Sequence, residues 1–164
     1  MSKIIKVGMA DMAVSNDSSA MLITYALGSC VGVSLYDPDK KVGGLIHVML
    51  PSSDKFKADP RSPKFADTGI PAIVEDIVKI GGRKNKLVAK IAGGAQMFAS
   101  SAKSKSSVLN IGSRNVEAVK ENLKKLNIPI VAEDTGANYA RTMEFYLEDG
   151  KVLIKTIGKG EKVL

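Results

Sequence analysis

Cysteine and histidine are almost absent from this chain of 164 residues, which holds one of each, Cys30 and His47. A single cysteine excludes a disulfide within the chain. Together the two residues fall short of the four Cys and His ligands that a structural zinc site takes from one chain, so no metal is expected. Aromatic residues make up only 5% and tryptophan is absent. The stacking surface that binds single-stranded nucleic acid is therefore poorly supplied, and no nucleic-acid partner is expected.

Long apolar runs are absent as well. No stretch approaches the ~18 consecutive apolar residues of a membrane-spanning helix, and residues 1–6 lack the apolar core of a secretory signal. We therefore expect a cytoplasmic protein without direct membrane insertion. At ~100–200 residues per domain, the length predicts a single domain over residues 1–164, large enough for one core without disulfide or metal.

The formal net charge of +7 lies entirely in the second half of the chain. Residues 1–82 carry nine basic and nine acidic residues, which leaves fifteen basic and eight acidic residues for 83–164. Charge alone bears on solubility and association and not on fold. Solvated lysines and docking to an acidic partner both remain open. Nucleic-acid binding is a third interpretation, and it would require affinity that falls steeply with salt.

The pattern of apolar residues predicts a mixed α/β class with largely antiparallel strands. Helices are expected over 68–80, which Gly81 and Gly82 end, and over 114–126, where apolar residues recur at helical spacing. Segment 51–67, which contains three prolines, and the Ser- and Lys-rich segment 100–107 are expected to be loops. Residues 93–95 are expected to form a tight exit from a strand. Strands are expected over 5–9, 22–27, 31–36, 42–50, 87–92, 128–132, 141–147 and 151–157.

The hairpin of residues 31–36 and 42–50 determines how Cys30 lies relative to His47. A two-residue loop, Pro38 and Asp39, pairs positions whose numbers sum to 77, and Cys30 then lies directly opposite His47. A four-residue loop raises that sum to 79 and makes His47 the diagonal neighbour on the same face. A three-residue loop or a bulge would place the two side chains on opposite faces, because side chains alternate with period 2. We expect the two side chains to lie side by side, with the register left open.

A thiol beside an imidazole can act as a nucleophile, since an adjacent imidazolium lowers the thiol pKa. The bend at Gly28, Ser29 and Cys30 could turn backbone N–H groups toward an oxyanion. Thr24 could accept a hydrogen bond from the second imidazole nitrogen and fix its tautomer. A buried free cysteine and a satisfied core histidine are the competing interpretation. The residues alone indicate at most a thiol hydrolase or an acyl transferase.

At these residues the sequence resembles the CheD family of chemoreceptor glutamine deamidases. The most specific matches are Leu-Gly-Ser-Cys at 27–30 and His-Val-Met-Leu-Pro at 47–51. Ala137 is a departure, because the family more often has a second glycine at this position, and this leaves the turn at 134–138 open. The wider segments that carry the resemblance are 24–33, 43–51, 64–71, 90–98 and 110–115.

The resemblance implies a layered α/β sandwich like the catalytic domain of bacterial cytotoxic necrotizing factors. It implies Cys30 as nucleophile, His47 as general base and acid, and Thr24 as support, with Gly28 and Ser29 as oxyanion candidates and no cofactor. The implied reaction converts selected glutamines of methyl-accepting chemotaxis receptors to glutamate, with release of ammonia, through a glutamyl thioester. The implied protein partner is the CheY-phosphate phosphatase CheC. The alternative is a regulatory binding module that mainly partners CheC, for which Cys30 could be dispensable.

Overall fold

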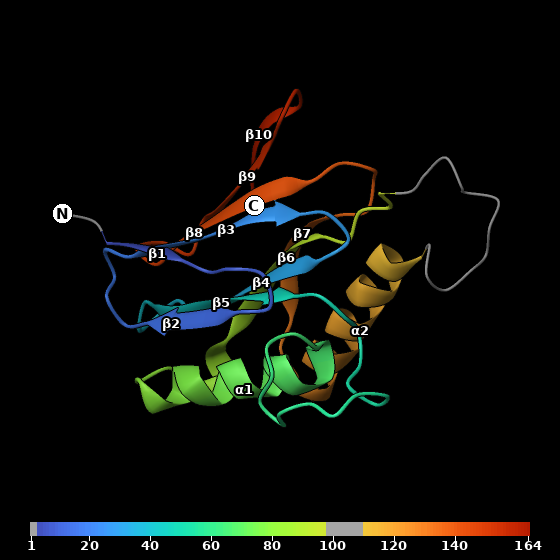
Figure 1. Cartoon of the computed structure of the whole chain (residues 1–164). Helices are drawn as coiled ribbons and strands as arrows, with labels where there is room; N and C mark the ends of the chain where they lie inside the picture. The colour runs from blue at the N-terminus through green and yellow to red at the C-terminus, as the bar shows by residue number, and fades with distance from the viewer. Residues whose placement is uncertain (1–2, 98–109) are drawn as a thin grey trace.

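The computed structural model describes residues 3–97 and 110–164, arranged as two stacked sheets with helices against one of them (Figure 1). The outer sheet has the order β1-β3-β8-β9-β10 and the central sheet the order β2-β5-β4-β6-β7. The outer strands are β1 (Ile4–Lys6), β3 (Met21–Leu27), β8 (Arg141–Tyr146), β9 (Val152–Thr156) and β10 (Gly160–Val163). The central strands are β2 (Met12–Ser15), β4 (Val31–Asp37), β5 (Val42–Val48), β6 (Val88–Gly93) and β7 (Ile130–Thr135).

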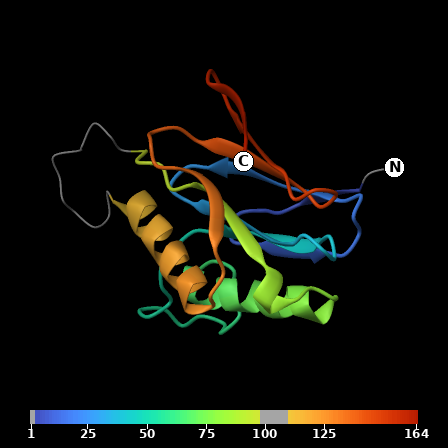
Figure 2. The same ribbon diagram turned by 180° about the vertical axis from the view of Figure 1, so that it is seen from behind.

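Two α-helices, α1 (Ala66–Lys79) and α2 (Ile111–Lys125), lie on the face of the central sheet that points away from the outer sheet (Figures 1 and 2). A short 3₁₀ turn, η1 (Lys84–Lys86), precedes β6. The central sheet is thus covered on both faces, and every residue of β4 and β5 is buried. One hydrophobic cluster fills the space between the central sheet and the helices, and a second fills the space between the two sheets.

The predicted mixed α/β class, the layered sandwich and both helices are confirmed, although each helix begins two or three residues earlier than expected. Most strand pairs are antiparallel, while β1 with β3 and β6 with β7 run parallel. Two edge strands, β2 and β10, were not predicted from the sequence. Their side chains show no buried face: β2 is half-buried throughout and β10 is exposed throughout. The expected loop at 100–107 falls outside the described residues.

The loop between β4 and β5 has four residues, so the two-residue loop considered from the sequence is wrong. Asp37 pairs with Val42, and Gly32 pairs with His47, which is the register in which paired numbers sum to 79. Two-residue hairpin turns of the favoured types need a positive φ at their first central position. Pro38 cannot adopt that φ, since its ring fixes φ near −65°. The positive φ falls instead on Lys41, at +54°.

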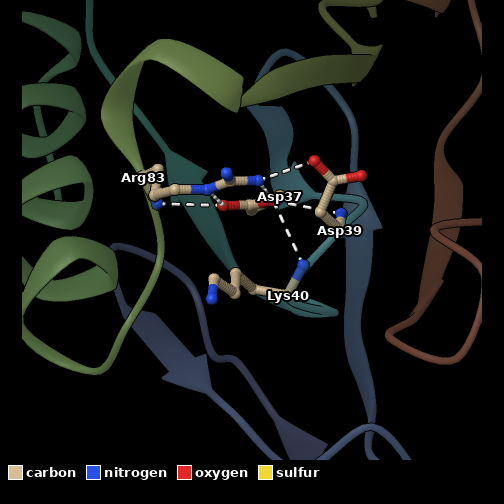
Figure 3. Close-up of polar contacts among 4 residues, drawn as sticks. All are labelled: Asp37, Asp39, Lys40 and Arg83. Atoms are coloured by element: carbon tan, nitrogen blue, oxygen red, sulfur yellow. Dashed lines mark hydrogen bonds and ion pairs between the residues drawn. The ribbon is translucent and has the colours of Figure 1, made fainter.

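Asp37 and Arg83 fasten this loop to the segment between α1 and β6 (Figure 3). The Asp37 side chain is fully buried, with its Oδ2 3.1 Å from Arg83 Nε, and Arg83 Nη2 lies 2.7 Å from Asp39 Oδ2. The N–H groups of Asp39 and Lys40 also donate to Asp37. Burial alone raises the pKa of Asp37, but the hydrogen bonds from Arg83 and Lys40 outweigh it and hold the pKa at about 2.

Candidate functional site

His47 projects from β5 into the space between the two sheets. Its Nδ1 lies 2.6 Å from the hydroxyl oxygen of Thr24 on β3, so a hydrogen bond joins the central sheet to the outer sheet. Both side chains are buried, with exposed fractions of 1% and 0%. A Cβ on Gly32, the partner of His47 on β4, would lie 2.8 Å from the sulfur of Met143, so Met143 would have to shift to admit a side chain there. The imidazole is therefore held between the layers.

Cys30 lies on the same side of the central sheet, one residue before β4. Extending the register by one residue pairs Cys30 with Met49 and makes His47 its diagonal neighbour, and Cys30 belongs to the hydrophobic cluster between the sheets. Its side chain is only 8% exposed. His47 Nε2 has no hydrogen-bond partner among the described residues. The structure thus brings Cys30, His47 and Thr24 to one region, with the bond between Thr24 and His47 formed.

Burial governs the protonation of the thiol and the imidazole. It lowers the pKa of His47 to about 4. It raises the pKa of the Cys30 thiol, an effect partly opposed by the backbone N–H of Cys30 itself. At neutral pH both groups are therefore uncharged in this state. The sequence suggested that an imidazolium lowers the thiol pKa. At neutral pH the described site holds a neutral imidazole instead.

The bend that carries Cys30 is anchored through three successive carbonyl groups. The Gly28 carbonyl accepts the N–H of Ala95 at 2.8 Å, and the Cys30 carbonyl accepts the N–H of Gly94 at 2.8 Å. Between them, the Ser29 carbonyl accepts from Asn115 Nδ2 at 2.9 Å.

The two oxyanion candidates differ in how their N–H groups are used. The Gly28 N–H already donates to the carbonyl of Ala26 at 3.0 Å. Within residues 3–97 and 110–164, by contrast, no acceptor binds the Ser29 N–H or the Cys30 N–H, apart from the sulfur of Cys30 itself. Among the described residues, Ser29 and Cys30 therefore hold N–H donors with no acceptor outside their own residue, and the Gly28 donor is engaged.

Two glycines allow β6 to end against this bend. Gly93 and Gly94 have φ values of +108° and +65°, which supports the tight strand exit expected from the sequence. A side chain on Gly93 would collide with the Cys30 carbonyl, and one on Gly94 would collide with Val116 of α2. The close approach of β6, α2 and the Cys30 bend thus depends on glycine at both positions.

Asn115 was missed by sequence reasoning, although a signal for it exists. It lies four residues before Val119 and so falls on the buried face of α2, where an amide is out of place. Its side chain is fully buried and contacts the bend directly. A polar residue on an otherwise apolar helix face was therefore the clue to this contact.

A β-bulge in β3 shapes the opposite side of the site. Thr24 pairs with Met143 and Leu27 with Arg141, so β3 contains one residue more than β8 between these pairs. Ala26 takes up the distortion with a φ of +58°. Thr24 and Leu27 consequently both point into the core, and Tyr25 is left 51% exposed.

The described residues hold neither a cluster of metal ligands nor a membrane-spanning helix. No group of three or more His, Cys, Asp or Glu side chains in residues 3–97 and 110–164 could hold a metal ion. None of the helices in this described part is long and apolar enough to cross a membrane. The site therefore consists of a thiol, an imidazole, a hydroxyl and main-chain N–H groups.

These features define the class: an α/β sandwich protein with a buried thiol and a buried imidazole gathered at the interface of its two sheets. A family model described as CheD chemotactic sensory transduction matches residues 49–156. The chain belongs to the CheD family, which confirms the resemblance seen in the sequence.

Relatives in several bacteria match over nearly their whole length. A protein of Caldanaerobacter subterraneus subsp. tengcongensis is 57% identical over 163 residues, covering 99% of each chain. Proteins of Lachnoclostridium phytofermentans and Clostridium botulinum are 54% and 53% identical, covering 97% or more of each chain. All three carry the name "Probable chemoreceptor glutamine deamidase CheD".

A solved structure shares the fold. A Neisseria meningitidis protein of the DUF152 family aligns with a TM-score of 0.51 over 99% of this chain and 73% of its own. Its sequence identity is 7%. The likeness therefore concerns the α/β architecture alone.

Proposed function

We propose that this chain is a protein-glutamine deamidase that converts selected glutamine side chains of methyl-accepting chemotaxis receptors to glutamate. The observation that carries the proposal is the hydrogen bond of 2.6 Å between Thr24 and His47, on the face of the sheet shared with Cys30. The names of the full-length relatives support glutamine as the substrate group and chemoreceptors as the substrate proteins. The reaction takes place in the cytoplasm, where the signalling helices of such receptors lie.

The first half of the reaction forms a thioester. Thr24 accepts the Nδ1–H of His47, so that Nε2 carries the lone pair and takes the proton of the Cys30 thiol. The thiolate attacks the carboxamide carbon, and a C–S bond forms. The resulting oxyanion accepts hydrogen bonds from the open N–H groups of Ser29 and Cys30. The protonated imidazole then donates its proton to the departing nitrogen, the C–N bond breaks, and ammonia leaves.

The second half hydrolyses the glutamyl thioester. His47 Nε2 takes a proton from water, whose oxygen attacks the thioester carbon. The C–S bond breaks, Cys30 regains its proton, and glutamate is released. The overall balance is glutamine plus water to glutamate plus ammonia, and His47 carries each proton transfer.

The uncharged state of Cys30 and His47 determines when the proton moves between them. Because burial keeps the His47 imidazole and the Cys30 thiol uncharged, proton transfer between them accompanies substrate attack and does not precede it. A bound amide with an oxyanion to stabilise makes the charge separation favourable. The free protein thereby keeps its thiol in the less reactive protonated form.

Mass spectrometry of a receptor fragment tests the proposal. Wild-type protein is expected to raise the mass of target glutamines by the change from amide to acid, and Cys30→Ala and His47→Ala are expected to abolish it while remaining folded. Full activity in Cys30→Ala would contradict the thiol mechanism.

The same proteins distinguish the deamidase from the alternative function, a regulatory module that mainly partners CheC. Wild-type protein that leaves every receptor glutamine unchanged, yet alters CheC phosphatase output equally well as Cys30→Ala, would favour that module over the deamidase. Binding to CheC stays a prediction from the resemblance.

A further inference from the structure

Asn115 joins the two segments that carry the thiol and the imidazole. Its Nδ2 donates to the Ser29 carbonyl and to the Met49 carbonyl, each at 2.9 Å. Ser29 directly precedes Cys30, and Met49 lies two residues after His47. A single side chain of α2 thus holds the nucleophile bend against the end of β5.

The two ends of the Asn115 amide differ in their hydrogen bonds. Its NH₂ group serves two carbonyls, whereas its Oδ1 is buried without a hydrogen-bond partner among the described residues. An unsatisfied buried acceptor costs about as much free energy as one or two hydrogen bonds provide. The Asn115 amide thus holds two carbonyls, while its acceptor finds no partner within residues 3–97 and 110–164.

The direction of one carbonyl fixes the direction of the next N–H. The peptide group is planar and trans, so the Ser29 C=O and the Cys30 N–H point in opposite directions. Asn115 holds the carbonyl toward α2, and the Cys30 N–H consequently points away from α2.

The neighbouring peptide groups are held in the same sense. The carbonyls of Gly28 and Cys30 accept from Ala95 and Gly94. These two residues pack against the start of α2, since a side chain on Gly112 would collide with the Ala95 carbonyl. The N–H of Ser29 is therefore also turned away from this anchoring layer, alongside the N–H of Cys30.

We propose that Asn115 is a positioning residue that aims the Cys30 N–H at the oxyanion of the substrate. It acts through the Ser29–Cys30 peptide group, and through Met49 it keeps that group in register with the strand of His47. The inference rests on the proposed deamidation. It predicts that loss of the amide impairs oxyanion stabilisation more than it impairs the thiol.

Two reactions of the same cysteine test this. The variants Asn115→Ala and Asn115→Leu are compared with wild type in deamidation of a receptor fragment and in alkylation of Cys30 by iodoacetamide. We expect kcat to fall about 10²–10³-fold, as on loss of one oxyanion donor, with KM within about threefold of wild type. Alkylation, which forms no oxyanion, is expected to stay within about threefold. Asn122→Ala is the matched control, because the Asn122 amide donates within α2 to Ala118.

Each other result overturns the inference. A folded variant with kcat close to that of wild type would show that the peptide group needs no help from Asn115. A parallel fall in alkylation and deamidation would assign Asn115 to the thiol or to general packing, and failure of both variants to fold would make it a determinant of stability. Wild-type protein that is alkylated normally but deamidates nothing would overturn the proposed function, and this inference with it.

Discussion

At the scale of single residues, the hydrogen bond between Thr24 and His47 sets which imidazole nitrogen is available as a base. Thr24→Val keeps the shape of the side chain and leaves the buried Nδ1–H unpaired, at a cost of about 1–3 kcal/mol. If that cost falls on the transition state, kcat drops about 5- to 150-fold. Ammonia release measured at saturating receptor fragment checks this. Thr24→Ser retains the hydroxyl and is expected to stay near wild type, and equal activity of Thr24→Val would contradict the role.

Burial of His47 also makes the free energy of unfolding depend on pH. Its pKa is about 4 in the folded chain against 6.5 for a free imidazole, so the unfolded chain takes up a proton first as the pH falls. The free energy of unfolding should then decrease from pH 6.5 down to 4, by about 3 kcal/mol in total. Urea titrations of wild type and His47→Gln across this range measure the difference. Parallel pH profiles of the two proteins would contradict a buried neutral imidazole.

At the scale of elements, the turn between β7 and β8 holds Ala137 in a backbone conformation that favours glycine. Ala137 has a φ of +60°, a conformation that costs an L-residue about 1–2 kcal/mol. Ala137→Gly removes that cost and adds about 0.5–1 kcal/mol of backbone entropy. We expect a net stabilisation of up to about 1 kcal/mol by urea denaturation, with unchanged deamidation.

Ala140 supplies the comparison for this turn, because it is exposed and has a negative φ. Ala140→Gly gains nothing from relief of strain and is expected to lose stability slightly. If Ala137→Gly lost as much stability as Ala140→Gly, the positive φ at Ala137 would carry no energetic cost.

Local patterns in the sequence were sufficient for the helices and for most strands, because one buried face repeats at a fixed period. Alternation placed Cys30 and His47 on one face only if the loop between the strands had an even number of residues. The hairpin register did not follow from alternation, since it depends on where Pro38 and Asp37 place the turn. The sequence signals a buried amide at Asn115 but not its partners, because these lie 66 and 86 positions away in the chain.

At the scale of the whole molecule, the Asp37–Arg83 pair ties the central sheet to the segment after α1. The pKa of Asp37 is about 2 in the folded chain against 3.8 for a free carboxyl. The charged carboxylate thus contributes about 2 kcal/mol of stability that is complete above pH 3.8 and lost as the pH falls through 2. Asp37→Asn should be less stable by about that amount at pH 7. Urea titrations at pH 7, 4 and 2 check this, and a difference from wild type that persists at pH 2 would contradict it.

The bond from Thr24 to His47 spans two sheets that meet through side chains. The position of the His47 imidazole therefore depends on how the outer sheet packs against the central sheet. A shift of the outer sheet by 1 Å would unseat the imidazole, and displacements of that size cost about 100-fold in rate. A change that displaces the outer sheet is therefore expected to lower the rate of deamidation even where Cys30 itself is unaltered.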